Sequence, residues 1–108
     1  MSVFRPASVK EMPEVFLSRW HVVEANDGVN KTLHFVGYNS HEGYGMVSSP
    51  ILEFDHNKKC GKTRSGRVYQ LVGQPGFNLE ADYVWQNWKN RNKIVESESI
   101  NIFERFIG

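Results

Sequence analysis

The stretch VFLSRWHVVEANDGVNKTLHFVGY, residues 15–38, decides the fold of this 108-residue chain. Residues 15–24 and 31–38 are both rich in β-branched and aromatic side chains, which favour extended backbone. Asn26-Asp27-Gly28 lies between them, and this tripeptide is typical of a tight turn. The stretch therefore predicts an antiparallel β-hairpin.

The register of the hairpin can be predicted from the polarity of its two faces. In one register apolar residues lie opposite apolar residues and polar ones opposite polar ones, whereas a shift by one residue mixes the faces. The predicted pairs are Glu24–Lys31, Val22–Leu33, His21–His34 and Trp20–Phe35. Two facing imidazoles bind a metal only with further ligands, and no carboxylate or third histidine at suitable spacing supports this. Two exposed strand histidines are the favoured interpretation.

Further strands are expected after the hairpin. Residues 46–55 predict a strand bent at Pro50, because proline cannot donate a hydrogen bond to a β-ladder. A turn at 56–59 precedes short strands at 62–64 and 67–72. Short strands with regular turns predict a small antiparallel sheet of four to six strands, strongly twisted or barrel-like.

One helix is expected at about residues 79–91. Asn78 is a favourable N-cap, and acidic residues near the start and basic residues near the end complement the helix dipole. One apolar stripe follows the helical period and consists of Ala81, Val84, Trp85 and Trp88. Trp85 and Trp88 are therefore expected to be largely buried against the sheet, whereas Tyr83 lies off the stripe.

Together these elements predict a single α+β domain over residues 1–108. An aromatic content of 13% with a net charge of only +1 favours an ordered core over disorder. Residues 1–13 are expected to form an irregular lead-in, since Pro6 and Pro13 interrupt regular structure. The tail 94–108 is compatible with a strand or a helix, and a short strand with a loose end is slightly favoured.

The same sequence predicts the cellular location. No apolar run is long enough for a membrane-spanning helix, so no membrane partner is expected. The first sixteen residues contain no apolar block, which argues against a secretory signal peptide. Cys60 is the only cysteine, which excludes an internal disulfide and a cysteine-based metal cluster. We therefore expect a cytoplasmic protein without a metal or other cofactor.

Charge is distributed unevenly along the chain. Residues 57–93 carry eight basic and two acidic side chains, although the whole chain has a net charge of +1. Closely spaced cations beside an exposed aromatic ring suit single-stranded nucleic acid. The candidate nucleic-acid-binding residues are Lys58, Lys59, Lys62, Arg64, Arg67 and Tyr69. A solvated loop that keeps a sheet edge soluble is favoured over this alternative, because dedicated nucleic-acid binders are far more basic.

Enzymatic activity has little support in the sequence, and no catalytic residue is predicted. Gly61-Lys62-Thr63 lacks the earlier glycine and the following helix of a phosphate-binding loop. No Gly-x-Ser-x-Gly elbow occurs. Cys60 lies among lysines that would make its thiol more reactive, but a catalytic cysteine also requires a placed base.

Four separated segments share a further pattern. They are Ser48-Ser49-Pro50-Ile51, Thr63-Arg64-Ser65-Gly66-Arg67-Val68-Tyr69, Gly73-Gln74-Pro75-Gly76 and Tyr83-Val84-Trp85. This pattern resembles that of short, functionally uncharacterised bacterial proteins of the plasmid and prophage type. The resemblance implies a cytoplasmic bacterial accessory protein and assigns no role to any residue.

The favoured function is a non-catalytic interaction module. Its partner would be another protein or a second copy of the chain, bound through a sheet edge and exposed aromatic residues. Nucleic-acid binding through the basic segment 58–67 is the alternative. An enzyme ranks third, because no acid–base pair or ligand set stands out.

Overall fold

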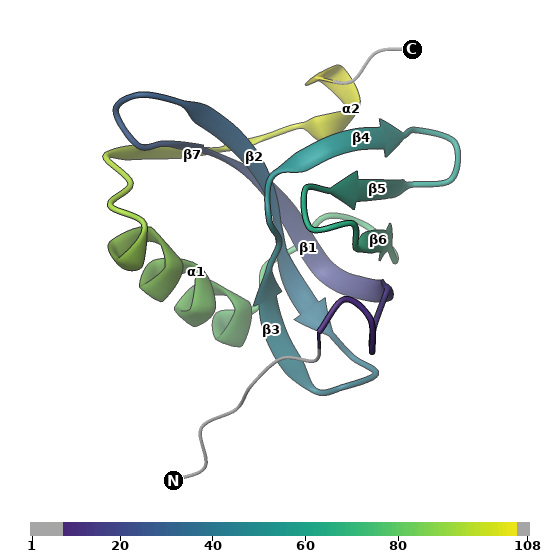
Figure 1. Ribbon diagram of the computed structural model, residues 1–108. Helices are drawn as coiled ribbons and strands as arrows, with labels where there is room; N and C mark the ends of the chain where they lie inside the picture. Colours follow the sequence, from purple (N-terminus) through teal and green to yellow (C-terminus); the bar gives the residue numbers. More distant parts are fainter. Residues whose placement is uncertain (1–7, 106–108) are drawn as a thin grey trace, which may run out of the picture.

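The computed structural model describes residues 8–105, which contain seven strands and two helices (Figure 1). In chain order the elements are β1 (Glu14–Asn26), β2 (Lys31–Asn39), β3 (Tyr44–Val47), β4 (Ile51–Asp55), β5 (Cys60–Thr63), β6 (Val68–Leu71), α1 (Leu79–Arg91), β7 (Glu96–Ile100) and α2 (Ile102–Arg105). They confirm the predicted α+β fold class. Neither of these two helices is long and apolar enough to cross a membrane.

All seven strands belong to one twisted, open sheet. Its order is β3-β2-β1-β6-β5-β4, and β7 also pairs with β1. β1 and β6 run parallel, whereas every other pairing is antiparallel. The sheet is therefore mixed rather than purely antiparallel, because the chain completes β2 to β5 before it returns as β6 alongside β1.

The strands of the structure differ in their bounds from the predicted ones, by one or two residues in β1, β2 and β6 and by more in two other places. The expected strand at 46–55 is divided at Pro50 into β3 and β4. Proline lacks the N–H group that would continue the ladder, so the chain changes direction there. The strand expected at 62–64 begins earlier, at Cys60, directly after the predicted turn at 56–59.

The β1–β2 hairpin is confirmed, but the predicted register is wrong by two residues. Asn26 pairs with Lys31, and His21 pairs with Val36, so that His21 does not lie opposite His34. A shift of two residues leaves every side chain on its predicted face, because side chains alternate with a period of two. The assignment of residues to faces was therefore correct, although the pairs were not.

Local hydrogen bonds explain why the hairpin turn is tighter than predicted. The side-chain oxygen of Asn26 accepts a hydrogen bond from the backbone N–H of Gly28, at 2.8 Å. Asp27 accepts two more, from the N–H groups of Asn30 and Val29. The hydrogen bond from Asn30, and to a smaller extent that from Val29, lowers the pKa of the Asp27 carboxyl group. Because the side chains complete the turn, the strands extend to Asn26 and Lys31.

β1 is long enough to have two different neighbours on one edge. β6 pairs with Glu14–Leu17, and β7 pairs with Val22–Asn26. Between these segments the ladder to β2 contains a bulge from Ser18 to His21, and Arg19 has a left-handed φ of 45°. The bulge increases the local twist, which turns the two halves of β1 toward different partners.

Both faces of the β1–β2 hairpin are covered, so the fold has two apolar clusters. α1 covers one face, and β4 to β6 curl over the other (Figure 1). The larger cluster contains Val15, Leu17, Trp20, Val22, Phe35, Met46, Ile51, Tyr69, Leu71 and Ile102. The smaller cluster, under α1, contains Val23, Ala25, Val36, Ala81 and Trp85. The face predicted to be polar is therefore an interior surface.

α1 has the predicted bounds and packs through the predicted stripe. The Asn78 side chain accepts a hydrogen bond from the N–H of Ala81 at 2.9 Å, as an N-cap does. Trp85 is 4% exposed. Trp88 is half-buried and stacks on Trp85, with ring centroids 5.4 Å apart. The burial prediction is confirmed for Trp85 and holds in part for Trp88.

The C-terminal tail contains the predicted short strand, which is β7. The helix α2 follows it, where a loose end was predicted. In α2, Ile102 is buried in the larger cluster, and the Phe103 ring lies 6.4 Å from that of Trp20. The remainder of the predicted loose end, 106–108, and residues 1–7 of the lead-in lie outside the described residues.

Candidate functional site

The structure separates the cations predicted to bind nucleic acid. Lys58 and Lys59 lie in the turn between β4 and β5, and Arg64 follows β5 at its other end. At about 3.3 Å per residue, Lys59 and Arg64 are about 16 Å apart along the strand. Lys62 lies between them, but the ladder pairs it with Glu53. The exposed cations are therefore distributed over the two ends of a hairpin.

Arg67 and Tyr69, the other two predicted residues, are buried. They are 8% and 2% exposed. The Tyr69 ring packs against that of Phe35 at 5.5 Å, and burial raises the pKa of its phenol. Arg67 Nε donates a hydrogen bond to the carbonyl oxygen of Met12 at 2.9 Å. In this structure the Tyr69 ring cannot stack on a base, and the Arg67 side chain contributes to the interior.

His34, expected on an exposed face, is fully buried between β2 and α1. Its Nδ1 lies 2.8 Å from the carbonyl oxygen of Ser48, which can only accept, so Nδ1 carries a proton. Nε2 then accepts a hydrogen bond from the Thr32 hydroxyl at 2.7 Å. The ring packs against Trp88 with a centroid distance of 4.5 Å. Both nitrogens of the neutral imidazole are therefore satisfied.

The surroundings of His34 favour its neutral form. Burial lowers its pKa below the ordinary value of 6.5, because the interior solvates the imidazolium poorly. The hydrogen bond to the Ser48 carbonyl acts in the opposite direction, and the positive charge of Arg64 lowers the pKa further. On the helix side, the Lys89 ammonium group lies over the ring of Trp85, 5.7 Å from its centroid.

This environment predicts that acid destabilises the protein. The unfolded chain takes up a proton at His34 near pH 6.5, whereas the folded state resists it to lower pH. The stabilisation from neutral His34 is thus complete above pH 6.5 and is lost as the pH falls through the lowered pKa. Urea unfolding at pH 7.5 and 5.5 measures this loss. The His34→Gln variant should lose less stability over the same interval, and an equal loss in both proteins would contradict the prediction.

A cavity of about 390 Å³ adjoins His34, but both ring nitrogens of His34 are already hydrogen-bonded. It is lined by Ala25, Asp27, Asn30, Lys31, Thr32, His34, Pro50, Arg64, Trp88, Asn92 and Ile94. The nearby hydroxyl of Ser48 donates to the carbonyl of Ser49 and accepts from the N–H of Phe35. A nucleophilic serine would require its hydroxyl to face a base, and His34 contacts the Ser48 carbonyl instead. The histidine and serine therefore act as structural links between β2 and the chain after β3.

No metal centre is formed by the described part of the chain. Within residues 8–105, no group of three or more His, Cys, Asp or Glu side chains is arranged to hold a metal ion. His41 stacks on Phe16 with centroids 5.2 Å apart. His56 packs against Phe54 and Phe103 at 5.5 and 5.6 Å. Cys60 is a free, half-buried thiol.

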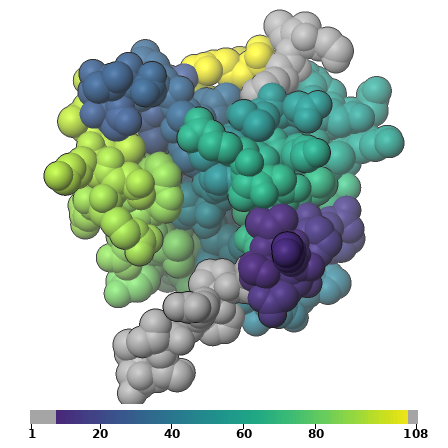
Figure 2. Space-filling model, viewed as in Figure 1, coloured from purple at the N-terminus to yellow at the C-terminus, as the bar shows by residue number. Residues whose placement is uncertain are grey.

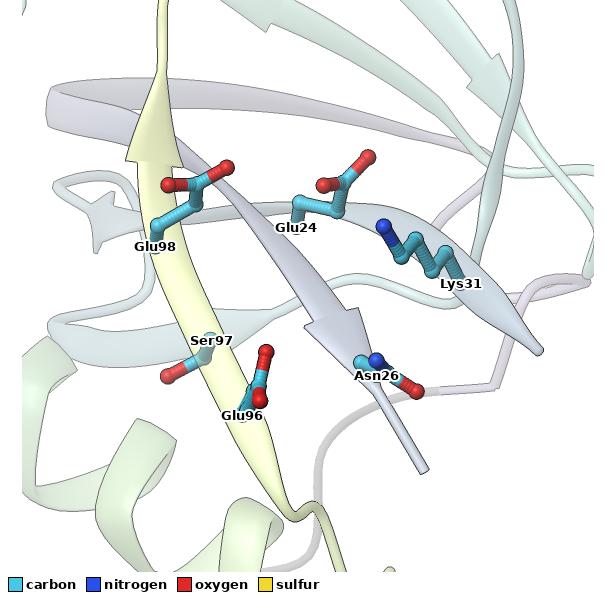
Figure 3. A pocket seen from close by; sticks show the side chains of 6 residues that line it. All are labelled: Glu24, Asn26, Lys31, Glu96, Ser97 and Glu98. Carbon is cyan, nitrogen blue, oxygen red and sulfur yellow. The ribbon is translucent and has the colours of Figure 1, made fainter. Parts of the chain in front are cut away.

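An acidic cavity of about 120 Å³ lies where β7 pairs with β1 (Figure 3). Glu24, Glu96 and Glu98 line it, together with Asn26, Lys31 and Ser97. Glu24 forms an ion pair with Arg105 at 2.7 Å, and the Lys31 ammonium group points toward Glu24 (Figure 3). The cations offset part of the negative charge. Charged side chains along β7 also discourage this edge strand from pairing with another copy of itself.

Three large apolar side chains are exposed around the start of α1, and we call them the outer patch: Phe77, Leu79 and Tyr83. They are 57%, 79% and 69% exposed. Leu79 and Tyr83 are four residues apart, so they share a helix face, which is opposite to the buried stripe. α1 lies at the outside of the molecule (Figure 2). The exposure of these three side chains means that no other described element covers them.

Two carboxylates flank the outer patch. At 100° per residue, Glu80 and Asp82 project on either side of the line through Leu79 and Tyr83. Their position in the first turn complements the helix dipole. Neither forms an ion pair with another residue of 8–105. Tyr83 was noted from the sequence as lying off the buried stripe, but Leu79 was missed, although its spacing of four residues from Tyr83 was a detectable signal.

The resemblance to bacterial plasmid and prophage proteins stays a prediction. No protein-family model, no curated protein and no solved structure matches the chain.

Proposed function

We propose that this domain is a non-catalytic binding module that docks a short segment of a protein partner on the outer patch. The observation that carries the proposal is the exposure of Phe77, Leu79 and Tyr83 on an otherwise well-packed helix. A helix needs only one apolar face to pack on its sheet, and α1 already has that face in Ala81 and Trp85. The second apolar face contributes nothing to the fold.

The size of the outer patch supports a small partner. Side chains of this size and exposure present roughly 300–400 Å² of apolar surface. A stable interface between two globular proteins buries about 800 Å² on each side, which is more than this patch offers. A peptide segment with two or three apolar anchors matches the available area, and its binding would be transient.

The charge around the patch supports a basic partner. Glu80 and Asp82 border the apolar surface without ion-pair partners in residues 8–105. In a symmetric dimer formed through this patch, the same carboxylates of two copies would meet and repel each other. A peptide with lysine or arginine beside its apolar residues would instead be attracted. We therefore favour a different protein over a second copy of this chain.

Selection of random twelve-residue peptides displayed on phage tests the proposal. We expect selected peptides to combine aromatic or aliphatic residues with Lys or Arg, and to bind with micromolar affinity. In fluorescence polarisation, the double substitution Leu79→Ser and Tyr83→Ser should weaken binding at least tenfold. Val95→Ser removes an apolar residue that is 65% exposed elsewhere and should change binding less than twofold. Peptides that bind the double variant as tightly as the original chain would disprove the proposal.

We extend the proposal to the bacterial cytoplasm as the location. The single free Cys60 supports a reducing compartment. In intact cells, a membrane-permeable maleimide should label Cys60 and an impermeable one should not. Labelling by the impermeable reagent would place the protein outside the cytoplasm.

A further inference from the structure

The unpaired segment of the β1 edge creates a gap in the sheet. Residues 18–21 pair with neither β6 nor β7 on that side of β1. The loop after β6 lies against the gap. Gly76 N–H donates a hydrogen bond to the carbonyl oxygen of Trp20 at 2.7 Å, and the Trp20 indole N–H donates to the carbonyl of Gly73 at 3.3 Å. This loop covers the gap without filling it.

The space that remains is a cavity of about 420 Å³. It is lined by Trp20, His21, Gln74, Pro75, Ser99, Ile100, Asn101, Ile102 and Phe103. Three parts of the chain form it: the β1 bulge, the loop after β6, and the junction of β7 with α2. Trp20 belongs to the larger cluster and Ile100 packs against it, whereas His21 projects from the opposite face of β1, so the cavity extends through the gap.

The lining defines the chemistry that the cavity would accept. The rings of Trp20 and Phe103 meet edge to face, with an interplanar angle of 61°. Pro75 and the two isoleucines add further apolar surface. None of the lining residues is Asp, Glu, Lys or Arg. An ion would therefore lose its hydration without gaining a partner of opposite charge, whereas a neutral ring would gain aromatic and aliphatic contacts.

A few polar groups accompany the apolar lining. His21, Gln74, Ser99 and Asn101 contribute an imidazole, two amides and a hydroxyl. The Gln74 side chain makes no hydrogen bond to another residue of 8–105, so both ends of its amide remain available. A mainly apolar cavity with a small number of polar groups is the usual form of a small-molecule site, and volumes of about 300–1,000 Å³ are typical.

We propose that this cavity binds a neutral aromatic small molecule of one or two rings. Its ring packs on the accessible surfaces of Phe103, Ile100 and Pro75, beside the buried Trp20, and its polar substituent bonds to the amide of Gln74. The site is separate from the outer patch and gives the domain a second ligand of a different class. The other two cavities described above are poorer sites for such a molecule, because one contains Asp27 and Arg64 and the other contains three glutamates.

The neutral fluorophore N-phenyl-1-naphthylamine is a suitable probe, because its emission increases in apolar surroundings. We expect saturable binding of one probe per protein. Gln74→Trp, at an exposed loop position, should fill the cavity and weaken binding at least tenfold. Val72→Trp is the matched control, since Val72 is exposed nearby and does not line the cavity, and it should change binding less than twofold. No saturable binding, or equal weakening by both substitutions, would overturn the proposal.

Two further measurements identify the site and the charge preference. In ¹H–¹⁵N spectra, the probe should shift the indole resonance of Trp20 and leave those of Trp85 and Trp88 in place. The anionic analogue 8-anilinonaphthalene-1-sulfonate should bind at least tenfold more weakly. Shifts confined to Trp85 and Trp88, or equal affinity for the two probes, would contradict the assignment. Loss of probe binding in the Leu79→Ser/Tyr83→Ser variant would place the probe on the outer patch and would also overturn it.

Discussion

The Trp85→Ala substitution is expected to lower the free energy of unfolding by about 3–5 kcal/mol. Trp85 is 4% exposed and is the largest side chain of the cluster under α1. Its removal leaves a cavity between the helix and β2 that the small neighbours Ala25 and Ala81 cannot fill. For a domain of this size, the total stability is about 5–15 kcal/mol, so the variant would lose a large fraction of it.

Urea unfolding followed by far-ultraviolet circular dichroism measures this loss, and Tyr83→Ala is the matched control. Tyr83 lies on the same helix and is 69% exposed, so its removal should change stability by less than about 0.5 kcal/mol. Trp88→Ala should have an intermediate effect, because Trp88 is only half-buried. Equal effects of Trp85→Ala and Tyr83→Ala would show that α1 does not pack on the sheet as described.

The Gly45→Ala substitution is expected to lower the free energy of unfolding by about 1–3 kcal/mol, toward the upper end of that range. A Cβ atom at this position in β3 would lie 2.5 Å from the Cα and the nitrogen of Ala81. Both are backbone atoms, so no side-chain rotation relieves the clash, and α1 must move away from the sheet. That movement also loosens the packing of Trp85.

Gly76→Ala is the control for Gly45→Ala, because the nearest atom to its added Cβ is 3.4 Å away, which is an ordinary contact. Thermal unfolding of both variants is the measurement. The double variant Gly45→Ala/Trp85→Ala should lose less stability than the sum of the single losses, since both act on the same helix–sheet contact. Full additivity, or a neutral Gly45→Ala, would indicate that β3 and α1 are not in close contact.

The helix and the candidate site differ in how far the sequence could predict them. The bounds of α1 were predicted correctly, because its cap, its charge order and its apolar stripe all lie within the helix itself. The outer patch was visible only in part, since Tyr83 off the stripe does not reveal that the surface around it is uncovered. The cavity at Trp20 was not predictable, because it is formed by three segments that are distant in the sequence.

The predicted nucleic-acid segment shows the same limit. The charge of this segment can be counted in the sequence, but the exposure of each side chain depends on how the strands pair and pack. Alternation along β6 places Tyr69 toward Phe35, and Arg67 extends to the Met12 carbonyl, which is far from it in the sequence. The run of cations also spans the whole length of β5. Lys59 and Arg64 are only five residues apart in the sequence, but they lie at opposite ends of this strand.

By itself, the sequence determined the α+β class, the positions of most strands and turns, the extent of α1 and the faces of the β1–β2 hairpin. These features follow from local preferences and from side-chain periodicity, which act over a few residues. Only the tertiary structure decided the parallel pairing of β1 with β6, the burial of His34 and the gap beside Trp20. These depend on which distant segments cover each face and edge, and the free energy of that choice comes from contacts that no local stretch of sequence contains.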